Sequence, residues 1–128
     1  MEFHKKFLFI DDDADDRDFF CTTMHMIDPT VQCFFAKDGV DAVEQLQGDL
    51  EFIPDFIFID MNMPRMDGIE CLTALRQMDR LHTAQIYIYS TTINPKVNQE
   101  VMALGASGIL IKPCTINELS NLLQQVIN

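Results

Sequence analysis

Hydrophobic and polar positions form alternating blocks along the chain, and these blocks predict strands and helices in turn. Short runs rich in Phe, Ile, Leu and Tyr have the composition of buried strands. They occupy residues 7–10, 31–36, 54–60, 85–89 and 108–111. Between the runs, apolar residues recur every three or four positions, which indicates amphipathic helices beginning near residues 14, 38, 67, 94 and 115.

Several predicted helices carry recognisable start signals. Asp67 with Glu70 and Thr115 with Glu118 have the spacing of a capping box, and Asn94 precedes a proline at the first helical position. The order is strand then helix, five times, which favours right-handed crossovers and a parallel sheet. We therefore predict an α/β fold, a (βα)5 doubly wound sheet with helices on both faces, as a single domain over residues 1–128.

Composition and charge exclude several classes of function. The chain has 128 residues, 48% of them hydrophobic and 23% charged, which is an ordinary globular composition. Its net charge of -11, from 20 acidic and 9 basic residues, argues against nucleic-acid binding by this chain alone. We find neither a signal peptide nor an apolar run of transmembrane length, so we expect no membrane association and a cytoplasmic location.

The spacing of the cysteines and histidines in the sequence indicates no metal site or disulfide. The four cysteines show no C-x-x-C pair and fall within apolar segments, so we interpret them as small core residues and not as metal ligands or disulfides. The three histidines are scattered without metal-ligand spacing and are interpreted as surface or hydrogen-bonded residues.

Polar residues of a particular kind follow the predicted strands. Asp11 and Asp12 follow the first strand, Asp60 ends the third, Ser90 follows the fourth and Lys112 follows the fifth. Carboxyl ends of parallel strands share one edge of the sheet, where ligands bind. An all-oxygen acidic site suits Mg²⁺, and a lysine with a hydroxyl beside it suits a phosphoryl group. Asp60 could then attack phosphorus and form an acyl phosphate.

Four motifs in order resemble the receiver domain of two-component response regulators, of the chemotaxis-regulator, stand-alone type. The resemblance covers roughly residues 5–127. It implies the flavodoxin-like strand order 2-1-3-4-5. The motifs are Phe-Ile-Asp-Asp-Asp at 9–13, Asp-Met-Asn-Met-Pro-Arg-Met-Asp-Gly at 60–68, Gly-Ala-Ser-Gly at 105–108 and Lys-Pro at 112–113.

The resemblance implies a phosphoacceptor and a metal site. Asp60 is expected to be the phosphoacceptor, giving an aspartyl phosphate with Mg²⁺ as cofactor. Asp12 is expected to bind Mg²⁺ directly and Asp11 largely through water. Asp60 and the backbone carbonyl of Asn62 are the further expected ligands.

The resemblance also implies switch residues. Ser90 is expected to move onto the phosphoryl group, Lys112 to pair with it, and the Lys112–Pro113 bond to be cis. Three positions depart from the commonest pattern of the family. Ser90 stands where threonine is more usual, Thr91 where a small residue is usual, and Ile109 where an aromatic switch residue is usual.

Partners follow from the same resemblance. A histidine kinase or histidine phosphotransfer protein is expected to donate the phosphoryl group, and an unidentified downstream protein to receive the signal through the fourth helix, fifth strand and fifth helix. The domain would be a signalling module, not an enzyme on an external substrate. No effector domain follows Ile127, so output is expected through partner binding unless the chain is a fragment.

The first acidic run, residues 11–16, also allows other interpretations. A small haloacid-dehalogenase-like, Mg²⁺-dependent phosphohydrolase would use Asp11 and Asp13, but Asp15 stands where threonine or valine is usual. An EF-hand loop fails, because Asp16 replaces the required glycine and Thr22 the glutamate. We interpret Asp15 and Asp16 as acidic residues that stabilise a helix N-terminus. Besides the receiver domain and the phosphohydrolase, an unphosphorylated binding scaffold is the third alternative for the function of the chain.

Overall fold

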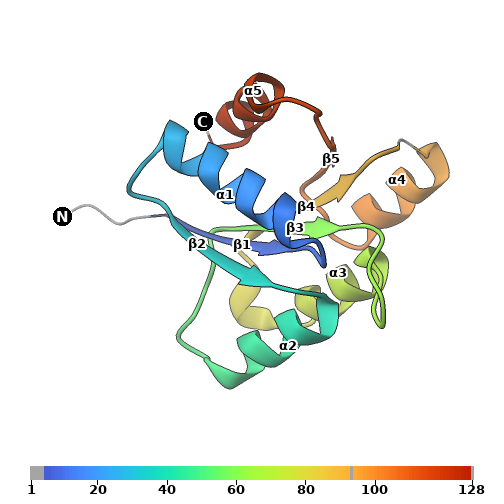
Figure 1. Cartoon of the computed structure of the whole chain (residues 1–128). Coiled ribbons are helices and arrows are strands. Elements are labelled where there is room, and N and C mark those ends of the chain that lie inside the picture. The colour runs from blue at the N-terminus through green and yellow to red at the C-terminus, as the bar shows by residue number, and fades with distance from the viewer. Residues whose placement is uncertain (1–4, 93, 128) are drawn as a thin grey trace.

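A computed structural model describes residues 5–92 and 94–127 of the chain. Within these ranges, parallel strands form a five-stranded sheet in the order β2-β1-β3-β4-β5, which confirms the predicted flavodoxin-like fold (Figure 1). The strands are β1 (Lys6–Ile10), β2 (Gln32–Ala36), β3 (Phe56–Asp60), β4 (Gln85–Ser90) and β5 (Gly108–Ile111). The helices are α1 (Ala14–Ile27), α2 (Gly39–Gly48), α3 (Gly68–Arg76), α4 (Pro95–Ala103) and α5 (Ile116–Ile127), with a 3-10 turn η1 (Asp79–Leu81).

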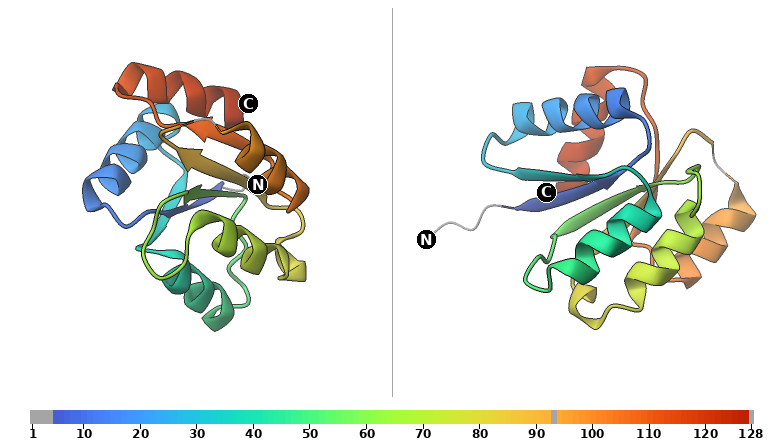
Figure 2. Two further views of the ribbon diagram at one scale, coloured as in Figure 1. Left: turned by 90° about the vertical axis from the view of Figure 1, so that its right-hand side faces the viewer. Right: turned by 60° about the horizontal axis from the view of Figure 1, so that its bottom comes forward.

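Helices cover both faces of the sheet. α1 and α5 lie on one face, and α2, α3 and α4 lie on the other (Figures 1 and 2). Successive side chains of a strand point to opposite faces, so Phe7 and Phe9 of β1 pack under α1 and α5 while Leu8 and Ile10 pack under the other helices. All of β3 is buried, as its near-continuous apolar sequence predicts.

The core under α1 and α5 is aromatic. Phe20 of α1 stacks on Phe9 with ring centroids 4.1 Å apart and tilts against Phe58 of β3 at 4.8 Å. Phe7 and Phe56 stack at 4.9 Å across β1 and β3. Such pairs contribute about 0.5–1.5 kcal/mol each beyond their buried area, so they help to fix α1 on the strands that end in the candidate site.

The predicted capping boxes differ in outcome. Asp67 and Glu70 form both reciprocal hydrogen bonds at the start of α3. At the start of α5, the hydroxyl of Thr115 accepts a hydrogen bond from the backbone of Glu118 at 3.1 Å, as predicted. The Glu118 carboxylate, however, accepts from the backbone of Cys114 at 3.3 Å, one residue before the position that a capping box requires.

The prediction that all four cysteines are core residues is only partly correct. Cys71 is buried, Cys21 and Cys33 are half-buried, and Cys114 is exposed in the loop before α5. Apolar neighbours in the sequence indicated burial, but a loop residue has no fixed inward face, so Cys114 was wrongly assigned.

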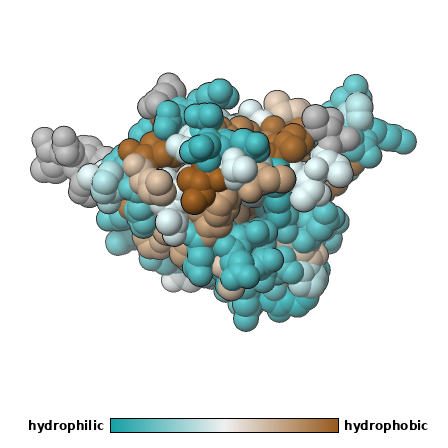
Figure 3. Space-filling model, turned by 45° about the horizontal axis from the view of Figure 1, so that its top comes forward, coloured by the Kyte–Doolittle hydropathy of each residue, from teal (hydrophilic) through white to brown (hydrophobic). Residues whose placement is uncertain are grey.

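The face of the molecule shown in Figure 3 mixes hydrophilic residues with small hydrophobic patches. Leu50 and Met26 are among the most exposed large hydrophobic side chains. No helix in the described ranges is long and apolar enough to cross a membrane.

Gly68, the first residue of α3, allows the loop after β3 to pack closely. A β-carbon at this position would lie 2.9 Å from the α-carbon of Met61 and 3.1 Å from the carbonyl oxygen of Asp60. Because both neighbours are backbone atoms, we predict that Gly68→Ala lowers the free energy of unfolding by about 1–3 kcal/mol in urea denaturation.

Gly48→Ala is the matched control. A β-carbon at Gly48, the last residue of α2, would have no neighbour within 4 Å. It should leave stability unchanged or raise it by about 0.4–1 kcal/mol, through the reduced entropy of the unfolded chain. Equal effects of the two substitutions would contradict the close approach at Gly68.

Candidate functional site

The predicted site residues lie where the strands of the sheet end. Asp11 directly follows β1, and its backbone N–H continues the pairing with β2 by donating to the carbonyl of Ala36 at 3.1 Å. Asp60 is the last residue of β3, and Ser90 is the last residue of β4. Lys112 follows β5, and its backbone N–H donates to the carbonyl of Ser90 at 2.8 Å. The sheet register thus brings the four positions to one edge.

Three carboxylates form a cluster at this edge. Asp11, Asp12 and Asp60 each offer an oxygen that lies within 4.8 Å of the others. Asp11 and Asp60 are buried, whereas Asp12 is exposed and open to an incoming ligand. Clustered carboxylate oxygens with one open side suit a hard divalent cation that keeps part of its water shell, so these residues could hold a metal ion.

Lys112 provides the positive charge of the cluster. Its Nζ lies 2.8 Å from Oδ1 of Asp60, 3.5 Å from Oδ2 of Asp11 and 3.4 Å from Oδ2 of Asp16. The third contact was not predicted, because Asp16 was interpreted only as a helix-stabilising residue. Asp16 lies in the first turn of α1, and this turn starts just after β1. Its position close to the end of a strand was the available signal.

The electrostatics favour a bound cation. Burial raises the pKa of Asp11 to about 6, and the charges of Asp60 and Asp16 add to the shift while the Asp13 backbone and Lys112 oppose it. Burial also raises the pKa of Asp60, although the hydrogen bond and charge of Lys112 act against it. For Lys112 itself, burial lowers the pKa, but the bond to Asp60 and the surrounding carboxylates outweigh burial and leave the pKa raised.

The loop between β1 and α1 is held by bonds that the sequence did not reveal. Oδ1 of Asp11 accepts from the backbone of Asp13 at 2.9 Å, and Nη1 of Arg17 donates to the Asp11 carbonyl at 2.7 Å. The Asp13 carboxylate caps α1 by accepting from the backbone of Asp15 at 2.8 Å and of Asp16 at 3.4 Å. These bonds fix the direction in which Asp11 presents its second oxygen to Lys112.

Ser90 and Asn62 both line a small cavity beside the carboxylates. The cavity holds about 170 Å³. Ser90 is buried, and its Oγ accepts a hydrogen bond from the backbone N–H of Thr92 at 3.3 Å. Asn62 and Thr91, by contrast, are exposed. Ile109 of β5 also lines the cavity. The lining residues are Met61, Asn62, Ile69, Ser90, Thr92, Asn94, Val97, Asn98 and Ile109.

The Lys112–Pro113 peptide bond is trans, so the expectation of a cis bond is wrong. The trans form is the intrinsically favoured isomer of an X–Pro bond by about 0.5–1 kcal/mol. Lys112 reaches Asp60 in this isomer because β5 delivers it directly beside Ser90.

The loop after Asp60 is tied to α2 by an ion pair that the sequence analysis missed. Arg65 lies in the left-handed region with φ of 66°, and its Nε donates to Oδ2 of Asp38 at 3.0 Å. Asp38 caps α2, and although burial raises its pKa, bonds from the Asp41 backbone and Arg65 leave that pKa lowered. The side chain of Met66 packs against Gly39, the first residue of α2. This link spans 27 residues, so no local pattern indicated it.

Solved structures share this architecture. The chemotaxis protein CheY4 of Vibrio cholerae is 32% identical, with a TM-score of 0.82 over 97% of this chain and 99% of that chain. The phosphorylated cyanobacterial phytochrome response regulator RcpA is 21% identical, with a TM-score of 0.86 over 97% of this chain and 91% of its own; at that identity it supports the fold alone.

Curated relatives match over part of their own length. The Regulator of RpoS of Escherichia coli K12 is 35% identical over 91 residues, which are 71% of this chain and 25% of that protein. The protein-glutamate methylesterase/protein-glutamine glutaminase 1 of Methanospirillum hungatei is 30% identical over 93 residues, 72% of this chain and 26% of that protein. The chain thus spans about a quarter of the length of these relatives.

The family model described as the response regulator receiver domain matches residues 7–124, which contain β1 from its second residue, the other four strands and the whole carboxylate cluster. A cluster of this kind at the carboxyl edge of a 2-1-3-4-5 sheet is what the motifs predicted. The chain belongs to the response regulator receiver domain family, the signalling modules of two-component systems.

Proposed function

We propose that Asp60 accepts a phosphoryl group and that the resulting aspartyl phosphate switches a partner-binding surface. The observation that carries this proposal is the 2.8 Å contact of Lys112 Nζ with Oδ1 of Asp60 inside the carboxylate cluster. A lysine held there can follow the negative charge as it moves from the carboxylate to phosphoryl oxygens.

The cluster would hold Mg²⁺ through Asp11, Asp12, Asp60 and the backbone carbonyl of Asn62. The side chains fit this role, because three carboxylates gather where a single lysine provides the nearby positive charge among the described contacts. Bound Mg²⁺ would offset the negative charge of the carboxylates and of the phosphoryl oxygens.

The transfer step uses residues of this chain as follows. An oxygen of the ionised Asp60 attacks the phosphorus of a phosphohistidine, the new O–P bond forms, and the N–P bond breaks with its electron pair leaving on the imidazole. Lys112 stays protonated throughout, and its raised pKa supports this state. The hydroxyl of Ser90, now accepting from Thr92, would turn to donate to a phosphoryl oxygen.

The proposed output surface is formed by α4, β5 and α5. Three large hydrophobic side chains are exposed on these elements: Met102 at 49%, Ile111 at 38% and Ile116 at 43%. Ile109 lines the cavity beside Ser90, so movement of Ser90 would be transmitted to β5 through packing. A histidine kinase or histidine phosphotransfer protein would donate the phosphoryl group, a downstream protein would bind this surface, and family membership supports a cytoplasmic location.

The phosphohydrolase alternative is not favoured. It would need Asp13 as an acid beside the nucleophile Asp11, yet the Asp13 carboxylate is occupied as the cap of α1. The carboxylate that joins Asp11 is Asp60, from a different strand. The family match supports a signalling module as well.

The proposal predicts that Asp60→Asn abolishes phosphorylation. The wild-type protein incubated with acetyl phosphate and Mg²⁺ should gain one alkali-labile phosphoryl group, detected by intact-mass spectrometry, whereas Asp60→Asn should gain none. Asp18→Asn, at an exposed position on α1, is the matched control and should react like the wild type. Undiminished labelling of Asp60→Asn would refute the assignment. Turnover of a phosphate ester that is lost in Asp11→Asn but kept in Asp60→Asn would favour the phosphohydrolase.

A second prediction concerns the crowded carboxylates. The folded-state pKa of Asp11, about 6, exceeds the ordinary 3.8, so the ionised carboxylate lowers stability at pH 7. Wild-type protein regains this stability as the pH falls through about 6 towards about 4. In EDTA at pH 7, Asp11→Asn should therefore raise the free energy of unfolding by about 1–2 kcal/mol.

Mg²⁺ should reverse the order of stability of the wild type and Asp11→Asn. Cation binding to the folded state stabilises the wild type, and Asp11→Asn, which has lost a carboxylate, should gain less. Urea denaturation in EDTA and in excess Mg²⁺, with Asp18→Asn as control, measures both effects. An Asp11→Asn protein that is less stable than the wild type in EDTA at pH 7 would contradict the account.

A further inference from the structure

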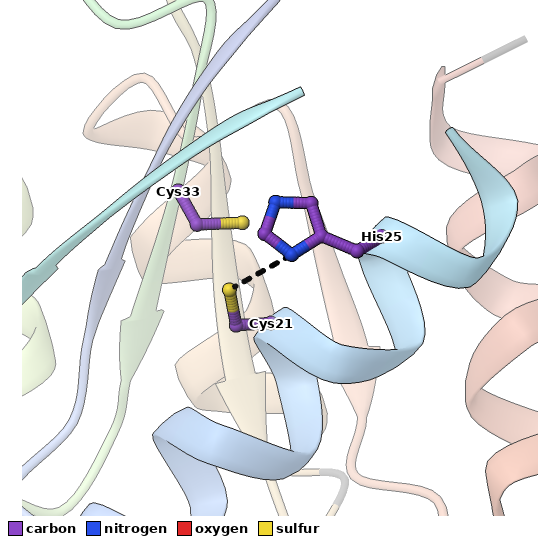
Figure 4. A group of neighbouring side chains, drawn as sticks. All are labelled: Cys21, His25 and Cys33. Atoms are coloured by element: carbon purple, nitrogen blue, oxygen red, sulfur yellow. Dashed lines mark hydrogen bonds between the residues drawn. The ribbon is translucent and has the colours of Figure 1, made fainter. Parts of the chain in front are cut away.

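A second cluster of metal-ligating side chains lies away from the carboxylate edge. Cys21 and His25 project from α1 and Cys33 projects from β2, and the three side chains point toward one another (Figure 4). One ligand atom of each lies within 4.8 Å of the other two. Cys33 of β2 pairs with Phe7 of β1 near the amino ends of these strands, whereas the carboxylates lie at the carboxyl ends. The two clusters share no residue.

The spacing fits a tetrahedral ion. With Zn–S of about 2.3 Å and Zn–N of about 2.0–2.1 Å, tetrahedral geometry separates a sulfur and a nitrogen ligand by about 3.6 Å. The Sγ of Cys21 and Nδ1 of His25 are 3.6 Å apart. Two of the three ligands thus already have the required separation, and a modest movement of Cys33 would complete the set.

The other nitrogen of His25 provides an independent observation. Nε2 lies 3.1 Å from the backbone carbonyl of Val31, and a carbonyl oxygen can only accept, so Nε2 carries the proton. In neutral His25 this leaves the lone pair on Nδ1, directed at the thiols. A backbone carbonyl that fixes the ring and its tautomer in this way is the usual partner of a metal-bound histidine.

We propose that Cys21, His25 and Cys33 form a site for a thiophilic divalent cation, Zn²⁺, with a fourth position open to water. Two thiolates and an imidazole are the ligand types that Zn²⁺ selects, whereas Mg²⁺ prefers oxygen. The cysteines are half-buried and His25 is exposed, so an ion can enter from solvent. Each bound thiol releases its proton to water, and the ion forms bonds to the two sulfurs and to Nδ1.

The simpler interpretation is a thiol–imidazole hydrogen bond that never binds metal. It accounts for the 3.6 Å contact between Cys21 and His25, and a hydrogen bond between the thiols of Cys21 and Cys33 accounts for the approach of Cys33 from β2. The two interpretations therefore differ in whether a cation replaces the thiol protons, which metal titration decides. The sequence carried one signal that was overlooked: Cys21 and His25 are four residues apart, which places them on the same face of a helix. The third ligand, from a strand after the turn, could not be inferred from spacing.

Cobalt titration tests the site. Co²⁺ is added to the full chain under anaerobic, reducing conditions with excess Mg²⁺, which is included to compete with Co²⁺ for the carboxylate oxygens. The expected result is a thiolate-to-cobalt charge-transfer band with tetrahedral d–d bands, saturating at one Co²⁺ per chain and abolished by equimolar Zn²⁺. Absence of the charge-transfer band in the wild-type protein would overturn the proposal without any variant.

Variants locate the ligands. Cys21→Ala and Cys33→Ala should each abolish the charge-transfer band at one equivalent, and His25→Gln should weaken Co²⁺ affinity at least about tenfold. Cys114→Ser and His82→Gln are matched controls, because both residues are exposed and lie outside the cluster. Circular dichroism establishes that each variant is folded. A band that persists in folded Cys33→Ala, or that disappears in Cys114→Ser, would place the metal elsewhere and refute the site. None of these outcomes depends on phosphorylation of Asp60.

Discussion

The contact between Lys112 and Asp60 is the interaction on which the rest of the site depends. Two buried or half-buried groups of opposite charge meet at 2.8 Å, and two further carboxylates lie within 3.5 Å of the same ammonium. Removing either partner would leave a charge with poor solvation, which is strongly unfavourable. The contact can form only because β3 and β5, which are separated in the sheet by β4, end at nearly the same level.

The sheet meets this requirement through its register. Asp60 pairs with Tyr89, and Ser90 pairs with Ile111, so β4 and β5 end together, one residue beyond the level of Asp60, and Lys112 is the next residue. The buried strand β3 leaves little freedom for Asp60, and the bonds around Asp11 fix the opposing carboxylate. The result is a negatively charged, preorganised edge, and under the proposed function added charge would be balanced by a cation or by movement of a neighbouring group such as Ser90.

Local patterns in the sequence predicted the fold and most of the site for identifiable reasons. Strand and helix periodicity gave the alternation, and polar residues at strand ends gave Asp11, Asp60 and Lys112. The contacts that were missed join segments far apart in the chain, such as Arg65 with Asp38 and Cys33 with His25. Such pairs depend on how the helices and loops pack against one another and on the sheet, which no local pattern specifies. The trans Lys112–Pro113 bond was missed for another reason, since the resemblance and not the residues implied cis.

The central claim is that occupancy of the carboxylate edge alters the surface formed by α4, β5 and α5. Amide NMR shifts recorded before and after adding Mg²⁺ with beryllofluoride, a phosphoryl mimic, test it most directly. The account predicts large shifts at Asp12, Asp60 and Lys112 and further shifts along α4, β5 and the start of α5. Shifts confined to the carboxylate edge would contradict the switch, and no shift at Asp60 would contradict the site itself.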